Sequence, residues 1–176
     1  MSPIAQLADR AYGRLLGILI ALVAMSIALI ATLIPANLLL VKMQWGNMWW
    51  LHEAVEYALY VGVFLGAPWV LRQGAHVRVD VLLSALSARA ATRLERAMDG
   101  VGALLCLTLC YYGVRIAISE FEDGTLPDKD LRIPTGYMML VFAVSFFLLA
   151  VEFLFRLRRS SEAVEAGISA SRESGF

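Results

Sequence analysis

No charged residue occurs between Arg14 and Lys42, and this run of 27 residues (15–41) constrains the fold most strongly. At 1.5 Å per residue, a helix of that length reaches about 40 Å, more than the roughly 30 Å hydrocarbon core of a bilayer. The run is too long for the apolar core of a cleaved signal peptide, which has about 7–15 residues. It predicts a retained membrane helix, with Pro35 and Asn37 marking a kink or the exit that absorbs the excess length.

Three further apolar segments are long enough to cross a membrane. Hydrophobic residues make up 60% of the chain and charged residues only 17%, compared with roughly 25% charged residues in a soluble domain. The sequence therefore predicts an all-α integral membrane protein in which residues 1–155 form one domain. We expect four transmembrane helices, at about residues 15–41, 49–71, 98–119 and 134–155. The polar tail, 156–176, has no apolar stripe and is predicted to be mobile.

Lysine and arginine are distributed unevenly over the predicted loops. Eleven of the 15 basic residues lie in the N-terminal segment, in the link between the second and third spans, or in the tail. The other four, Lys42, Arg115, Lys129 and Arg132, lie at the opposite ends of the spans. By the positive-inside rule, both termini and the middle link face the cytoplasm. We expect a multi-pass protein of the bacterial inner membrane.

The second span has two distinct faces. On one face alanine or glycine recurs every four residues, at Ala54, Ala58, Gly62 and Gly66. Such a seam of small side chains lets another helix backbone approach closely. Glu53 and Glu56 lie on roughly the opposite side, and carboxylates do not face lipid. Covering both faces favours contact with a partner protein.

The charged residues within the spans have alternative interpretations. Glu56 and Arg115 lie at similar depths in their spans, which favours an ion pair within the chain. A contact with a separate subunit and an ion or proton site are the alternatives. Glu152 and Arg156 are four residues apart at the end of the fourth span, a spacing that predicts a structural pair on one helix.

The link after the second span is basic. In residues 80–97 an apolar face adjoins a stripe of arginines, which predicts an amphipathic helix lying in the membrane interface. A short helix packed under the bundle is an equal alternative. We expect Asp80 to cap this helix and Arg78 to meet lipid phosphates. The residues assigned to a subunit or lipid interface in this region are Arg72, His76, Arg78, Asp80, Arg89, Arg93 and Arg96.

Several functional classes are excluded by the sequence. The balance of 15 basic and 15 acidic residues excludes a nucleic-acid binder that relies on net charge. Cys106 and Cys110 lie within an apolar run, so we expect buried free thiols rather than a redox or metal pair. His52 and His76 are too far apart in the chain to hold one haem. We therefore expect no catalytic residue, metal or cofactor, and no substrate site in this chain.

A motif in the middle link resembles a known family. The motif is R-x-G-x-H-V-x-V-D, which follows a glutamate-bearing second span. Its residues, with the glycine and alanine before it, are Gly66, Ala67, Arg72, Gly74, His76, Val77, Val79, Asp80 and Leu82. Within four spans and this topology, it resembles the small, Q-type membrane subunit of tripartite ATP-independent periplasmic (TRAP) transporters. Pro127, Ile133, Pro134 and Tyr137 are similar in outline.

The resemblance implies an accessory subunit of a secondary transporter. In that family a periplasmic binding protein captures the solute, often an organic acid. A large multi-span membrane subunit moves it, driven by an ion gradient. The small subunit would then act as a scaffold among membrane lipids, with no solute site of its own. The alternatives are a membrane anchor for a redox enzyme and a small self-sufficient exporter.

Overall fold

The structure is a computed structural model that describes residues 3–73, 88–124, 126–129 and 131–173. Within these residues the chain forms four helices: α1 (Pro3–Lys42), α2 (Leu51–Arg72), α4 (Ala88–Asp123) and α5 (Thr135–Glu173). Each helix is long and apolar enough to cross a membrane. A helix satisfies its backbone polar groups internally, which a lipid environment requires. The prediction of an all-α protein with four membrane-spanning helices is confirmed.

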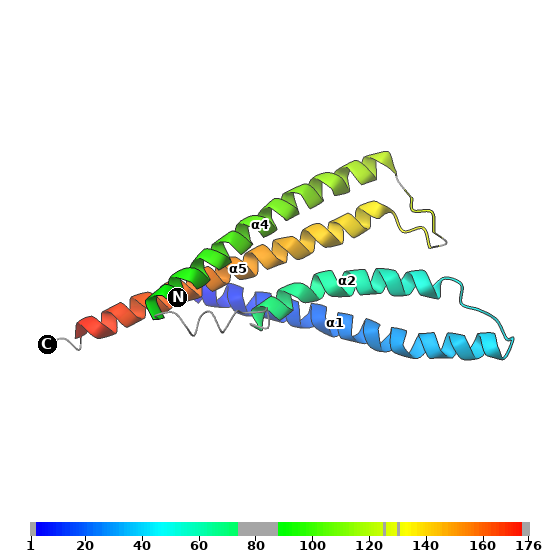
Figure 1. Ribbon diagram of the computed structural model, residues 1–176, viewed down its shortest axis with the longest axis horizontal. Coiled ribbons are helices and arrows are strands. Elements are labelled where there is room, and N and C mark those ends of the chain that lie inside the picture. Colours follow the sequence, from blue (N-terminus) through cyan, green and yellow to red (C-terminus); the bar gives the residue numbers. More distant parts are fainter. Residues whose placement is uncertain (1–2, 74–87, 125, 130, 174–176) are drawn as a thin grey trace.

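The helices form two hairpins, α1–α2 and α4–α5, that lie beside each other in one twisted layer (Figure 1). The order across the layer is α1, α2, α5, α4, because the extensive contacts join these successive pairs. The hairpins meet near the N-terminus and diverge toward their connecting loops (Figure 1). We call the end with the N-terminus, Arg72 and Ala88 the termini end. The end with loops 43–50 and 124–134 is the loop end.

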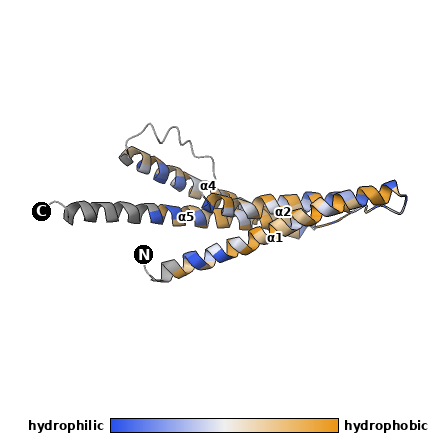
Figure 2. Cartoon of the chain, turned by 90° about the horizontal axis from the view of Figure 1, so that it is seen from below, coloured by the Kyte–Doolittle hydropathy of each residue, from blue (hydrophilic) through white to orange (hydrophobic). Residues whose placement is uncertain are grey.

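The interior of the layer is small. Leu71 of α2, Cys106 of α4 and Leu149 of α5 form one buried cluster. Tyr12 of α1 packs on Leu148 of α5 in a second cluster. Both clusters join the two hairpins, so the core lies where the hairpins meet. Figure 2 shows that hydrophobic residues dominate the helices toward the loop end and that hydrophilic ones gather toward the termini.

Glycine allows α4 and α5 to pack closely. A Cβ atom added at Gly102 would lie 2.7 Å from the ring of Phe153, and one at Gly113 would lie 2.8 Å from the ring of Phe142. No real side chain tolerates such distances without movement of the neighbour. The two glycines therefore admit the phenylalanine rings of α5 against the α4 backbone.

Three of the helices, α1, α4 and α5, are longer than the predicted spans. α1 begins at Pro3 rather than at residue 15, and it continues past Pro35 to Lys42. α2 likewise continues past Pro68 to Arg72. Neither proline ends its helix, because membrane helices tolerate the missing N–H where neighbouring groups compensate.

Two predicted segments at the termini end are helical where the structure describes them. Residues 88–97 of the predicted interfacial helix form the first turns of α4, continuous with the third span; residues 80–87 lie outside the described residues. The tail continues α5 to Glu173, and its mobility stays a prediction. An apolar stripe is unnecessary for a helix that extends an already formed span, because the preceding turns supply the nucleus.

Candidate functional site

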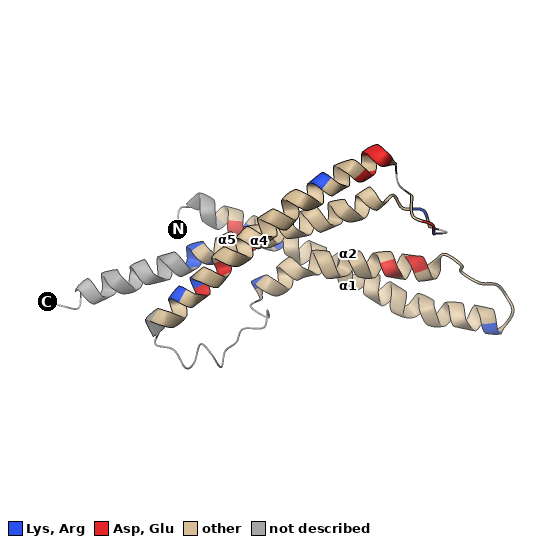
Figure 3. Cartoon of the chain, turned by 45° about the horizontal axis from the view of Figure 1, so that its top comes forward, with Lys and Arg blue, Asp and Glu red and all other residues tan. Residues whose placement is uncertain are grey.

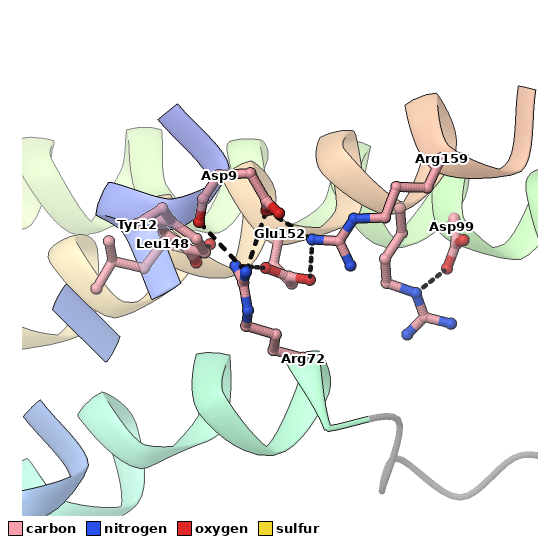
Figure 4. A network of polar contacts seen from close by, with 8 residues as sticks. Asp9, Tyr12, Arg72, Asp99, Leu148, Glu152 and Arg159 are labelled. Carbon is pink, nitrogen blue, oxygen red and sulfur yellow. Dashed lines mark hydrogen bonds and ion pairs between the residues drawn. The ribbon is translucent and has the colours of Figure 1, made fainter. Parts of the chain in front are cut away.

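The charged residues gather toward the two ends of the layer, and the middle of each helix is mostly uncharged (Figure 3). At the termini end, Arg72 in the last turn of α2 joins three helices (Figure 4). Its guanidinium lies 3.1 Å from a carboxylate oxygen of Asp9 in α1 and 3.4 Å from one of Glu152 in α5. It also donates a hydrogen bond to the backbone carbonyl of Asp9, at 3.2 Å.

Neighbouring side chains complete this arrangement. Arg159 lies 2.7 Å from Asp9 and 3.7 Å from Glu152. The Tyr12 hydroxyl donates a hydrogen bond of 2.7 Å to the Leu148 carbonyl, and the Tyr12 ring lies 5.6 Å from the Arg72 guanidinium carbon. Tyr12 thereby holds α1 against α5 beside the charges.

A further ion pair joins α4 to the same end of α5. Arg156 lies 3.4 Å from a carboxylate oxygen of Asp99, which is buried. With this pair the group has equal numbers of acidic and basic side chains. We call it the ion network: Asp9, Arg72, Asp99, Glu152, Arg156 and Arg159.

Burial makes the ion network important for the stability of the fold. The Glu152 side chain is 0% exposed, and a buried carboxylate is costly unless cations and hydrogen bonds compensate it. Arg159 lies on the same helix as Glu152, whereas Arg72 provides its part of this compensation only when α2 is docked against α5. The network thus makes the fold of each hairpin depend on the other.

At the loop end, the glutamates of α2 contact Lys129 and Leu131 in the loop between α4 and α5. Glu53 accepts a hydrogen bond from the backbone N–H of Leu131, and Glu56 forms an ion pair with Lys129. The Tyr57 hydroxyl donates to the Leu131 carbonyl at 3.3 Å, and the Lys129 ammonium lies 5.1 Å from the centre of the Tyr57 ring. The hydrogen bond to Glu56 raises the pKa of Lys129 above its ordinary value.

The small-residue seam of α2 packs on α1. A Cβ atom added at Gly62 would lie 3.3 Å from Val23, and one added at Gly66 would lie 3.7 Å from Ile20. Ala58, one turn before Gly62, is half-buried. The sequence predicted contact with a partner because α2 has two faces to cover. Within the chain, α1 packs over the glycines. Lys129 and Leu131 contact the glutamates, of which Glu56 stays exposed.

Both predicted ion pairs are wrong in their partners. Glu56 pairs with Lys129 rather than Arg115, because the loop between α4 and α5 folds back over the end of α2. Glu152 pairs with Arg72 of α2 and with Arg159, seven residues further along its own helix. Arg156, four residues further along α5, points to Asp99 of α4 instead.

The remaining predicted interface residues are distributed as follows. His76, Arg78 and Asp80 and the side chain of Arg89 lie outside the described residues, whereas Arg93 is exposed and Arg96 half-buried on α4. Sequence reasoning missed Asp9, Tyr12, Asp99, Lys129 and Arg159. The available signal was that Asp9 and Asp99 are acidic residues at a basic end of the molecule.

The chemistry of these groups is that of contacts between helices. Cys106 and Cys110 are free thiols, and Cys106 is buried. Among the described residues, no group of three His, Cys, Asp or Glu side chains is placed to hold a metal ion. The charged groups at both ends bond to other parts of this chain and hold its helices and loop together.

Comparison with known proteins gives one match. The model of a protein family described as "Tripartite ATP-independent periplasmic transporters, DctQ component" matches residues 43–163. The matched residues include all of α2 and α4 and the part of α5 that carries the ion network. Neither the curated proteins nor the solved structures gave a match.

Proposed function

Since the chain belongs to the DctQ-component family of tripartite ATP-independent periplasmic transporters, and is thus a small membrane subunit of such a transporter rather than an enzyme, we propose that it is a non-catalytic scaffold. In this proposal it holds the large membrane subunit in the bacterial inner membrane. A periplasmic binding protein delivers an organic acid that bears a carboxylate, and an ion gradient drives its import through the large subunit.

The observation that carries the scaffold proposal is the open, single-layer arrangement of the helices. The most apolar window of α1 is only 6% buried within the chain, and that of α5 is 33% buried. Membrane helices of one chain that bury so little against each other present broad apolar faces to lipid or to another protein. A scaffold for a second membrane subunit needs such a surface.

The use of the charged residues supports the same proposal. An ionisable group within a membrane span is by default a candidate for an ion pathway. Here Glu53 and Glu56 bind residues of the loop, while Glu152 binds two arginines. These carboxylates have structural partners, which favours a path for the solute and its coupling ions through the large subunit.

The distribution of basic residues supports an orientation for the scaffold. The termini end holds the arginines of the N-terminal segment, the middle link and the tail, so we place it in the cytoplasm. The loop end then faces the periplasm. Lys129 and Leu131, which contact Glu56 and Glu53, would lie on the side from which the binding protein approaches.

Reconstitution of defined subunit combinations tests the proposed function. The large subunit and binding protein are incorporated into vesicles with the small subunit, without it, or with the small subunit as the sole membrane component. We expect uptake of a carboxylate solute from the complete set, and none from the small subunit with the binding protein alone. Uptake by the small subunit without the large one would contradict the proposal.

A further inference from the structure

Arg115 is a basic residue in an apolar part of α4. Its side chain is exposed. Among the residues that the structure describes, no hydrogen bond or ion pair involves it, unlike the arginines of the ion network. An arginine in a membrane span is costly unless it pairs or reaches a polar region.

Arg115 faces away from the rest of the layer. The buried residues of α4 that face α5 include Ala103, Cys106 and Ala117, and at 100° per residue Arg115 lies on nearly the opposite side of the helix. α4 is also the edge helix of the layer, with extensive contacts only to α5. The side chain therefore points away from the other helices, toward the lipid or the partner protein at this edge.

Two tyrosines accompany Arg115 on the exposed surface. Tyr111 is 59% exposed and Tyr112 is 53% exposed, and their ring centres are 5.4 Å apart. Tyr111 lies one helical turn before Arg115 on the same face. Tyrosine and arginine are enriched where protein interfaces bind most strongly. We call Tyr111, Tyr112 and Arg115 the α4 patch.

The geometry of α4 favours a protein carboxylate over a lipid phosphate as the partner. The headgroup region nearest to Arg115 is at the C-terminal end of α4, where Glu120, Glu122 and Asp123 repel phosphate. Side chains on a helix lean toward its N-terminus. Arg115 therefore leans away from that end, toward Tyr111 and deeper into the apolar part of the span.

We propose that the α4 patch docks against a membrane helix of the large transporter subunit that carries an Asp or Glu at the depth of Arg115. The guanidinium binds the carboxylate, and the tyrosine hydroxyls donate further hydrogen bonds beside it. The inference rests on the proposed scaffold function. It adds that the α4 edge of the layer is the one that binds the large subunit.

Co-purification from cells that express both subunits tests the inference. In a maltoside detergent, which contains no phosphate, Arg115→Leu should lower the recovery of the large subunit about 3- to 10-fold, in line with interhelical polar contacts in membranes. Arg115→Lys keeps the charge and should retain most of the recovery. Arg158→Leu, which removes an exposed arginine of α5 that belongs neither to the α4 patch nor to the ion network, is the matched control and should have no effect.

Cross-linking locates the contact independently of stability. In a variant without Cys106 and Cys110, Tyr111→Cys should cross-link to cysteines placed one turn from a membrane-embedded acidic residue of the large subunit. Thermal melting of Arg115→Leu alone should match the unmodified small subunit, which shows that the variant folds.

The outcomes separate the two proposals. Unchanged recovery of Arg115→Leu together with absent cross-links would overturn the inference and leave the scaffold function standing. A loss confined to phospholipid nanodiscs, with full recovery in maltoside, would identify lipid phosphate as the partner and also overturn it. Failure of the unmodified small subunit to co-purify would contradict the scaffold function itself.

Discussion

At the scale of single residues, burial separates the charged groups of this chain into two kinds. Glu152 is 0% exposed and depends on arginines from α2 and α5. Glu56, by contrast, is 62% exposed in its pair with Lys129. An exposed pair contributes little because water screens it and the side chains lose freedom. Removing one member of a buried pair leaves an uncompensated charge and is far more costly.

We therefore expect Arg72→Leu to destabilise the small subunit by about 3–5 kcal/mol. The reason is that Glu152 loses its partner on α2 and Asp9 loses the ion pair that joins α1 to α2. The measurement is thermal or denaturant unfolding in detergent, with the exposed Arg93→Leu as the control, which we expect to change stability by less than about 0.5 kcal/mol. Equal stability of the two variants would show that the ion network does not hold the hairpins.

The second prediction at this scale concerns pH at the loop end. The hydrogen bond to Glu56 raises the pKa of Lys129 above its ordinary 10.5, so the pair favours the docked loop below that pH. This contribution should be lost as the pH rises through the raised pKa. A spin label at residue 126 should gain mobility there, whereas Glu56→Gln should show reduced pH dependence. A label equally mobile at pH 8 and pH 12 would contradict the assignment.

At the scale of helices, sequence patterns predicted the spans well but did not predict which residues their charged side chains contact. Uncharged runs identify a membrane helix because its length and hydrophobicity are local properties, as for residues 15–41. The glycine seam of α2 is likewise local, and it packs on α1 through Gly62 and Gly66. The partners of Glu56 and Glu152 depend on how the loop 124–134 folds and on which helices adjoin. Neither can be read from spacing along one helix.

Two glycines of α4 offer a test of helix packing. A Cβ at Gly102 would lie 2.7 Å from Phe153, whereas one at Gly100 would meet nothing within 4 Å. Gly102→Ala should therefore destabilise the α4–α5 hairpin by about 1–3 kcal/mol. Gly100→Ala is the matched control, which should be neutral or stabilising by up to about 1 kcal/mol because alanine favours helix. Unfolding in detergent measures both, and the reverse order of stability would contradict the packing.

At the scale of the whole molecule, the open layer could not be foreseen from the sequence. Four apolar spans fit a closed bundle as well as a layer, because lipid can cover any face that protein does not. The order α1, α2, α5, α4 follows from which helices pack extensively on each other, and the contacts of Arg72 and Tyr12 join the first three of them. The consequence for function is a large apolar surface available to a second subunit.

The orientation of the layer is tested by labelling single cysteines in a variant without Cys106 and Cys110. Gly46→Cys lies in the loop 43–50 and should react with a membrane-impermeant maleimide added to intact cells. Arg93→Cys, at the termini end of α4, should react only after the cells are opened. Rapid reaction of Arg93→Cys in intact cells would reverse the assigned orientation.

The central claim is that this subunit supports transport without carrying solute or coupling ions. The direct measurement is uptake per assembled complex at several ion gradients, for the unmodified protein and for Glu53→Gln, Glu56→Gln and Glu152→Gln. We predict that these variants change the amount of complex recovered, while uptake per complex and the number of ions coupled to each solute stay constant. A variant that assembles normally but changes the number of coupled ions would contradict the claim and place its carboxylate in the transport path.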